Sequence, residues 1–329
     1  MKNLRIWIIM VLFATGGALF WGCDSLIYDD LKDCPQGVYV KFYSKTPPCA
    51  DDSLFIGNVS SLTVFAFDQE GKLSTTIQQQ NVNLSRDFEV LVPVSNGNYS
   101  FIAWAGINDK FNKNTFSPGG VTTKEDVMMT INSTNNIATT LTSTEHIWHG
   151  ESPVVFLPNP EEYGSLYKHT AINLKELTNR IKIIIEFDKV TMKEYDPTKL
   201  NVDVSSANGT VRINGTMPMN TPVLTYPSIE TKLEGNTGEW NYAMLDLTTG
   251  YSNKLNITYT GNDKEETVFD GDLIASILLR AVDKGVNLDC ENDFTIKFLI
   301  KDYCAECWTH FSCAIYVNNW LVHSYSTDL

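Results

Sequence analysis

Hydrophobic and polar residues alternate along much of this chain with a period of two, which is the period of a β-strand. Residues 38–43 alternate in this way, and residues 62–67 form a β-branched and aromatic run that ends in a polar stretch. Further strands are predicted at residues 88–94, 99–105, 181–187, 255–259, 294–300 and 314–317. Turn-forming residues 95–98 join two of these segments, so residues 88–105 are predicted to form a β-hairpin.

Helical periodicity is sparse. Leu273, Ile274, Ile277 and Leu278 have the spacing of one short amphipathic helix. Residues 122–125, Thr-Thr-Lys-Glu, resemble a capping box and predict a second helix start. No internal repeat with a period of about 20 to 50 residues is present, which excludes solenoids and propellers. The pattern therefore predicts an all-β protein built from antiparallel sandwiches.

Length and composition indicate two folded domains. The chain has 329 residues, of which 43% are hydrophobic and 19% charged, so it has enough apolar material for packed cores and too little charge for disorder. Residues 158–168 are rich in Pro, Glu, Gly and Tyr and separate two apolar regions. We therefore expect one sandwich domain at residues 34–168 and another at residues 169–329.

The first residues have the pattern of an export signal. Lys2 and Arg5 precede an apolar run at residues 6–22, which ends abruptly at polar residues. A membrane-spanning helix is the alternative, but the run is at the short limit for a span, contains Gly16-Gly17 and has no basic stop after it. Residues 1–22 are therefore predicted to be a signal peptide.

Gly22-Cys23 is typical of the site at which bacterial lipoproteins are cleaved and lipidated. Cys23 is the predicted lipid-bearing residue and the first residue of the mature chain. Phe20-Trp21 departs from the usual lipobox, which has Leu and a small residue there. Residues 23–33 would form a short acidic tether, too charged to enter the lipid.

The other cysteines form an even set, which favours disulfides in an exported protein. Closeness along the chain favours Cys34 with Cys49, although six cysteines permit 15 connectivities. The alternative for the last cysteines is a zinc or redox site, with His310 close by, but thiolate zinc sites compete poorly with oxidation outside the cytoplasm. The disulfide candidates are Cys34, Cys49, Cys290, Cys304, Cys307 and Cys313.

Charge and motifs exclude several classes of function. The net charge of -14 is opposite in sign to the basic surface that nucleic-acid binding needs. The chain has no dinucleotide-binding glycine pattern, no phosphate-binding loop and no serine nucleophile elbow. His146 and His149 are three residues apart, so in a strand their side chains would diverge rather than share a zinc ion. No cofactor, metal or enzymatic activity is therefore expected.

The mature-chain tryptophans are the candidates for stacking on sugars. Each lies in a strand-like or apolar setting where packing in the core is the commoner outcome, so a glycan-binding role stays open. The candidates are Trp104, Trp148, Trp240, Trp308 and Trp320.

Four stretches together resemble one known family. Residues 23–40, with Cys23, the acidic tether and Asp33-Cys34-Pro35, are the most specific match, and residues 98–106 match a strand that ends in Ala-Trp-Ala-Gly. Residues 174–185 and the ending 317–320, in which Asn319 replaces the usual glycine, complete it. The chain resembles the FimB-like fimbrial anchor and accessory subunits of Bacteroidales type V pili.

The resemblance implies two transthyretin-like β-sandwich domains and a non-enzymatic role. A protein of this family would be held in the outer membrane by lipid on Cys23, at the cell surface. It would anchor a fimbrial shaft, limit the length of that shaft and contact the shaft subunits by β-strand addition. A fimbrial tip adhesin and a glycan-binding surface lipoprotein are the alternatives, and an extracytoplasmic hydrolase is a remote one.

Overall fold

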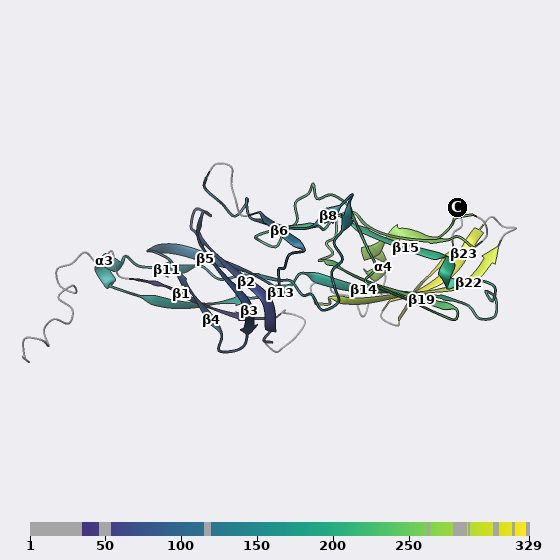
Figure 1. Cartoon of the computed structure of the whole chain (residues 1–329), viewed down its shortest axis with the longest axis horizontal. Helices are drawn as coiled ribbons and strands as arrows, with labels where there is room; N and C mark the ends of the chain where they lie inside the picture. The colour runs from purple at the N-terminus through teal and green to yellow at the C-terminus, as the bar shows by residue number, and fades with distance from the viewer. Residues whose placement is uncertain are drawn as a thin grey trace, which may run out of the picture.

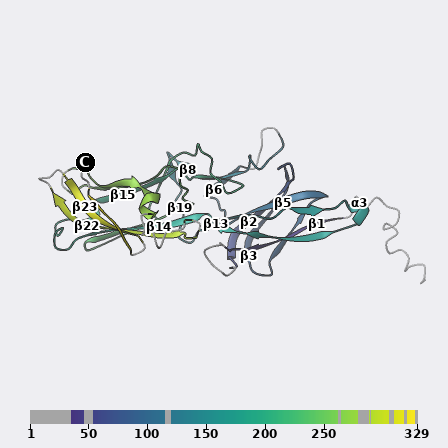
Figure 2. The same ribbon diagram turned by 180° about the vertical axis from the view of Figure 1, so that it is seen from behind.

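The computed structural model describes residues 35–45, 54–114, 120–261, 264–278, 288, 290–304, 309–317 and 320–326. The side chains of residues 302–310 and 320–326 are not among those described. Strands dominate, and two β-rich bodies lie end to end in an elongated molecule (Figures 1 and 2). The prediction of an all-β fold is confirmed.

The N-terminal body is a sandwich of two sheets. Its smaller sheet has the order β12 (Tyr167–Asn173), β1 (Gly37–Tyr43), β4 (Glu89–Pro93). Its larger sheet has the order β13 (Lys175–Glu176), β10 (Trp148–Glu151), β5 (Gly97–Ala105), β2 (Gly57–Asp68), β3 (Leu73–Leu84), with β11 (Val155–Leu157) also paired to β5. Alternate residues of β1 and β4, such as Val38, Val40 and Val92, are buried against Phe101 of β5.

The predicted hairpin at residues 88–105 is wrong, although both of its strands exist. β4 pairs with β1, whereas β5 pairs with β2 and β10 in the opposite sheet. The residues between the two strands therefore cross from one sheet to the other. Both strands bury apolar side chains in the same core, so the hydrophobic pattern of a hairpin and of a crossing between sheets is the same.

The C-terminal body has two six-stranded sheets. One has the order β18 (Glu230–Glu234), β19 (Thr237–Leu245), β14 (Thr178–Phe187), β22 (Asp293–Cys304), β23 (Thr309–Val317), β24 (Trp320–Ser326). The other has the order β21 (Glu266–Asp272), β20 (Asn253–Tyr259), β15 (Leu200–Ser206), β17 (Leu224–Tyr226), β9 (Ile137–Ala138), β8 (Ser133–Thr134). In β14, Ile181, Ile183, Ile185 and Phe187 point into the core between these sheets.

The described residues form short helices at three places, α3 (Pro160–Tyr163), η2 (Pro197–Lys199) and α4 (Leu273–Leu278). α4 confirms the predicted amphipathic helix. The helix start predicted at residues 122–125 is wrong. There the Asp126 carboxylate accepts hydrogen bonds from the Thr123 amide and hydroxyl, both at 2.8 Å, which makes a turn that leads into β7 (Met128–Ile131).

The two bodies meet at a contact region that we call the junction, where segments of the N-terminal half join the C-terminal body. β7 lies between β6 (Phe111–Asn114) and β16 (Thr210–Arg212), and β9 pairs with β17. One hydrophobic core runs across the junction and includes Phe65 and Trp104 of the N-terminal sandwich. The boundary predicted near residue 168 stays a prediction. β12, which begins at Tyr167, pairs in parallel with β1.

Candidate functional site

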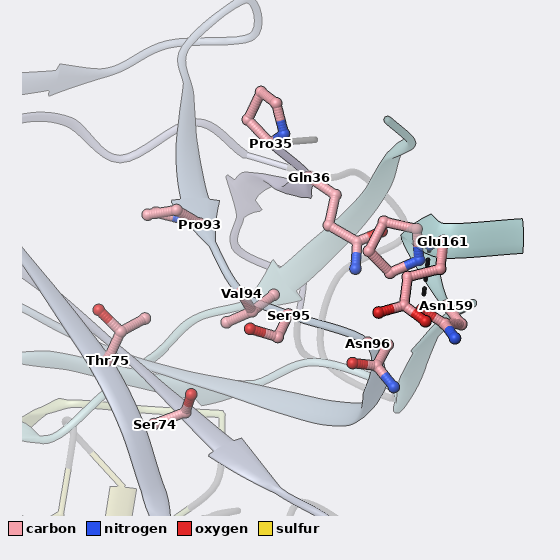
Figure 3. A pocket seen from close by; sticks show the side chains of 11 residues that line it. Pro35, Gln36, Ser74, Thr75, Pro93, Val94, Ser95, Asn96, Asn159 and Glu161 are labelled. Atoms are coloured by element: carbon pink, nitrogen blue, oxygen red, sulfur yellow. Dashed lines mark hydrogen bonds between the residues drawn. The ribbon is translucent and has the colours of Figure 1, made fainter. Parts of the chain in front are cut away.

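A cleft of about 590 Å³ opens at the end of the N-terminal sandwich that is remote from the junction. We call it the tip cleft. Three loops and the start of β3 form its walls, and the amide of Gln36 reaches into it (Figure 3). The lining residues are Pro35, Gln36, Ser74, Thr75, Pro93, Val94, Ser95, Asn96, Asn159, Pro160 and Glu161.

Gln36 is the buried polar residue of the tip cleft. It directly precedes β1 and is only 7% exposed. Its Nε2 donates a long hydrogen bond of 3.5 Å to the Pro158 carbonyl, while its Oε1 is buried without a hydrogen-bond partner. Beside it, Asn159 caps α3 by accepting a hydrogen bond from the Glu161 amide at 3.1 Å. The Gln36 oxygen is thus buried behind the wall of the cleft without a hydrogen-bond donor.

The opposite end of this sandwich carries a charged group that we call the junction cluster, formed by His146, Glu176, Arg180 and Asp293. Arg180 is the first charged residue of β14 and directly precedes the alternating apolar positions of that strand. Its guanidinium binds Asp293 through two hydrogen bonds of 2.6 and 2.8 Å, and its Nη1 lies 2.6 Å from Glu176 Oε1. His146 Nδ1 lies 2.7 Å from the same Glu176 oxygen. The cluster links β13, β14 and the start of β22.

The electrostatics of the junction cluster follow from these contacts. The hydrogen bonds from the Arg180 guanidinium hold the pKa of Asp293 below its usual value, and Asp293 in turn raises the pKa of Arg180. Two parallel N–H···O bonds to one carboxylate fix direction as well as distance. Glu176 is 11% exposed at its side chain and depends on Arg180 for charge compensation.

A second charged group lies next to the junction cluster. The Glu145 carboxylate receives hydrogen bonds from Asn108 at 2.5 Å, Lys110 at 2.6 Å and the Thr142 amide at 2.5 Å. Burial raises the pKa of Glu145, but these donors outweigh burial and lower it overall. The contacts hold two loops of the N-terminal half together beside the junction.

The histidine pair singled out in the sequence is split by the structure. His146 belongs to the junction cluster, whereas the His149 ring is buried and its Nε2 lies 2.7 Å from the Ile213 carbonyl. Burial lowers the pKa of His149. Within the part of the chain that the structure describes, no group of three His, Cys, Asp or Glu side chains could hold a metal ion.

The cysteine predictions have different outcomes. Cys23, Cys34, Cys49 and Cys307 lie outside the described residues, and the side chain of Cys304 is not described. Cys290 is disulfide-bonded. The disulfide predicted for Cys313 is wrong, because its free thiol is packed in the apolar core of the C-terminal body, where burial raises its pKa to about 12.

The candidate tryptophans whose side chains the structure describes are packed within the protein rather than exposed for stacking on sugars. Trp104 is completely buried and Trp240 is 7% exposed. Trp148 is half-buried and stacks on His146 with ring centroids 6.4 Å apart. The side chains of Trp308 and Trp320 are outside the described set.

Edge strands of the sheets carry main-chain N–H and C=O groups that no neighbouring strand pairs. β3 is an edge strand of 12 residues that pairs with β2 on one side, and β24 is the edge of the sheet in the C-terminal body. The pairing of β3 with β2 shifts register between Ala66 and Phe67, opposite Thr75 and Leu73, which marks a β-bulge near the start of β3. In the described part of the chain, no helix is long and apolar enough to cross a membrane.

Sequence reasoning missed the tip cleft and the role of Arg180. The signal for Arg180 was present, because a basic residue directly before an apolar strand requires an acidic partner when it becomes half-buried. The cleft had no such signal, because its Ser, Thr, Asn and Pro residues are the ordinary composition of turns.

Comparisons with known proteins give a consistent result. The sequence profile described as "Mfa2: Fimbrillin-A associated anchor proteins Mfa1 and Mfa2" matches residues 31–326. The minor fimbrium anchoring subunit Mfa2 of Porphyromonas gingivalis is 35% identical over 315 residues, which are 94% of this chain and 93% of that protein.

Solved structures resemble this fold over most of its length. The fimbrial anchor protein Mfa2 from Porphyromonas gingivalis superimposes with a TM-score of 0.77 at 33% identity, covering 89% of this chain and 100% of that one. A Bacteroides thetaiotaomicron protein, described as a candidate for polysaccharide binding, has a TM-score of 0.70 at 21% identity over 88% of this chain and 98% of its own. That second likeness shows the fold alone. Sequence and structure together place this chain in the family of fimbrillin-A associated anchor proteins Mfa1 and Mfa2.

Proposed function

We propose that this protein is a non-enzymatic outer-membrane lipoprotein that anchors a fimbrial shaft to the cell surface and limits its length. The observation that carries the proposal is the 35% identity, over nearly the whole chain, to a protein named as a minor fimbrium anchoring subunit. The export signal and Cys23 supply the hold on the membrane. One acyl chain binds membranes only marginally, so the several chains of a lipoprotein are what would resist load.

The shape of the molecule supports a division of labour between its two ends. The chain enters the described structure at Pro35, 12 residues after Cys23, beside the tip cleft. The C-terminal body lies at the other end of the long axis (Figure 1). An anchor attached through Cys23 would therefore present its C-terminal body to the shaft.

Strand addition is the contact that we infer between this body and the shaft. An edge strand offers unpaired main-chain N–H and C=O groups, which a strand of another subunit can complete. Among the described residues, β24 is an edge strand of its sheet in the C-terminal body, and it is the strand that we assign to this contact. Replacing one residue of β24 with proline should weaken binding of the shaft protein by removing a main-chain donor.

Deletion of the gene tests the anchoring role. Cells that lack the protein should still make shaft subunits, but the fimbriae should be longer than normal and be shed into the medium. Electron microscopy of washed cells measures length and retention together. Normal length and retention, combined with loss of adhesion to a surface, would contradict the anchor and favour a tip adhesin.

A further inference from the structure

Exposed aromatic side chains gather at the tip, which is the end of the N-terminal sandwich that carries the tip cleft. Tyr163 of α3 is 69% exposed, Phe156 of β11 is 55% exposed and Tyr167 of β12 is 41% exposed. In the described part of the chain, one other aromatic side chain is comparably exposed, that of Phe55 at 46%. The large apolar side chains exposed on the C-terminal body are aliphatic, as at Val190. Aromatic exposure is therefore concentrated at one end of the molecule.

The strand register places these aromatic residues at similar depths behind the tip. Tyr167 is paired with Gly37, the first residue of β1. Phe156 is next to Leu157, which is paired with Gly97, the first residue of β5. α3, which carries Tyr163, lies beyond these strand ends at the extreme of the long axis (Figure 1). Because a strand rises about 3.3 Å per residue, Phe156 and Tyr167 lie within roughly 7 Å of the strand ends beside α3.

The residue types at the tip are those that favour a membrane–water interface. A tyrosine places its ring among lipid head groups and its hydroxyl in water. Lys168 lies with its Nζ 5.8 Å from the centroid of the Phe156 ring, and a lysine stem can lie along apolar surface while its ammonium stays hydrated. α3 also carries Glu161 and Glu162, and carboxylates are costly in hydrocarbon. The tip therefore suits the head-group region and not the hydrocarbon core.

The length of the chain that precedes Pro35 brings this end of the molecule to the membrane. Pro35 lines the tip cleft and is 12 residues after Cys23, so a lipid on Cys23 would hold the tip within about 40 Å of the membrane surface. A tether of this length makes a second contact with the same membrane intramolecular, at a high effective concentration. A few interfacial side chains can then hold a contact that would be too weak without the tether.

We propose that the tip lies in the head-group region of the outer leaflet of the outer membrane, with Phe156, Tyr163 and Tyr167 among the lipid head groups. This inference rests on the proposed lipid anchor. Interfacial helices bury their apolar faces by roughly 5 to 10 Å, and the same depth would cover all three side chains. Contact through one end of an elongated molecule directs its C-terminal body, and with it β24, away from the membrane.

Site-specific photo-crosslinking of the full-length lipoprotein tests the contact. Benzoylphenylalanine is placed at Tyr163 in one protein and at Val190 in a matched control. Val190 is 75% exposed and follows the end of β14 that is remote from the junction. Each protein is reconstituted into vesicles of phosphatidylethanolamine and phosphatidylcholine and irradiated. Mass spectrometry should find lipid adducts at position 163 at least ten times as often as at position 190.

A second pair of variants tests whether the rings make the contact. With the crosslinker at Tyr167, lipid adducts should fall at least fivefold in Phe156→Ser/Tyr163→Ser. The control is Val190→Ser/Met219→Ser, which removes two exposed apolar side chains from the C-terminal body and should leave the adducts unchanged. All four changed residues are more than half exposed, so the melting temperatures of both variants should stay close to that of the wild type.

Flotation of the vesicles on a density gradient separates the tip contact from the anchor. Flotation with equal adducts at positions 163 and 190, or with adducts that persist in Phe156→Ser/Tyr163→Ser, would overturn the tip contact and leave the anchor intact. A crosslink in cells from position 163 to a protein in place of lipid would do the same. Absence of flotation would overturn the lipid anchor and the tip contact with it.

Discussion

The two ends of the N-terminal sandwich use polar residues in different ways. At the junction, Arg180 is bonded to Glu176 and Asp293, and a continuous apolar core lies beneath them. At the tip, Gln36 keeps a buried oxygen without a hydrogen-bond partner beside a cleft lined mainly by Ser, Thr, Asn and Pro residues. The junction is thus held by paired charges over a shared apolar core, whereas the tip is an open polar cleft.

The largest effect on stability is expected from Arg180→Ala. The change leaves the mostly buried Glu176 carboxylate without its guanidinium partner and also removes the paired bonds to Asp293. The free energy of unfolding should fall by about 3 kcal/mol. Urea unfolding of the mature protein measures it.

Lys232→Ala is the control for Arg180→Ala. Lys232 pairs with Glu230 at 3.1 Å, but both side chains are at least half exposed, so its loss should cost under about 1 kcal/mol. Equal costs for the two variants would show that the junction cluster is no stronger than a surface ion pair.

The partner of Cys290 gives the second prediction, because distance excludes most candidates. β22 separates Cys290 from Cys304 by a 12-residue strand, which spans roughly 36 Å, so neither Cys304 nor the nearby Cys307 can reach it. Cys313 is free. Pro35, the residue that follows Cys34 in the sequence, lines the tip cleft, about 20 Å away along β1 from the junction end.

Cys49 is the remaining candidate, and it follows Lys45, whose amide donates to Asn173 near the junction. We predict a Cys49–Cys290 disulfide that ties the two halves together, in place of the Cys34–Cys49 pair that closeness in sequence favours. Non-reduced peptide mapping should find these two peptides linked. Cys290→Ser should lower the free energy of unfolding by about 2 to 4 kcal/mol. A Cys290 peptide linked to any other cysteine would contradict this pairing.

Mild acid should destabilise the junction end of the sandwich more than the tip end, because protonation of His149 opposes folding. Burial lowers the folded-state pKa of His149, so the unfolded chain binds the proton more readily. The resulting stability is complete above the unfolded pKa of about 6.5 and is lost as the pH falls through it. Glu151 and Lys175 are the charged groups that act on the ring, and their effects on its pKa oppose each other.

The free energy of unfolding should therefore decrease from pH 7 to pH 5.5. His149→Gln keeps a donor for the Ile213 carbonyl and should remove most of this dependence. His169→Gln, at a histidine whose side chain is 63% exposed, should leave it unchanged. The measurement is the urea midpoint of unfolding at the two pH values for the wild type and the two variants. An identical change of midpoint with pH in all three proteins would rule out His149 as the cause.

Local pattern was enough to place many strands, because alternate residues of β1, β14 and β20 are buried on one face. β3 escaped prediction because Gln78, Gln79 and Gln80 interrupt its apolar positions at the edge of its sheet. The junction cluster was out of reach for another reason. Arg180 and Asp293 are 113 residues apart, and periodicity carries no information about which distant charges meet.

The same distinction applies to the functional residues. Cys23 could be proposed as the lipid-bearing residue from sequence alone, because lipidation is specified by adjacent residues in the chain. The tip cleft needed the fold, because Gln36, Asn96 and Asn159 come from three separate segments that meet only when the sandwich forms. Sites made by one segment can be read from sequence, whereas sites made by several require the topology.

Attachment of the shaft through Cys23 is the central claim, and one variant tests it most directly. Cells that produce Cys23→Ala in place of the wild-type protein should release the shaft protein into the medium, because a folded anchor without lipid has no hold on the membrane. The measurement is the ratio of shaft protein in the supernatant to that on washed cells, with Cys313→Ser as a cysteine control. A large rise in this ratio for Cys23→Ala alone is the predicted result. A ratio equal to that of the wild type would contradict the account.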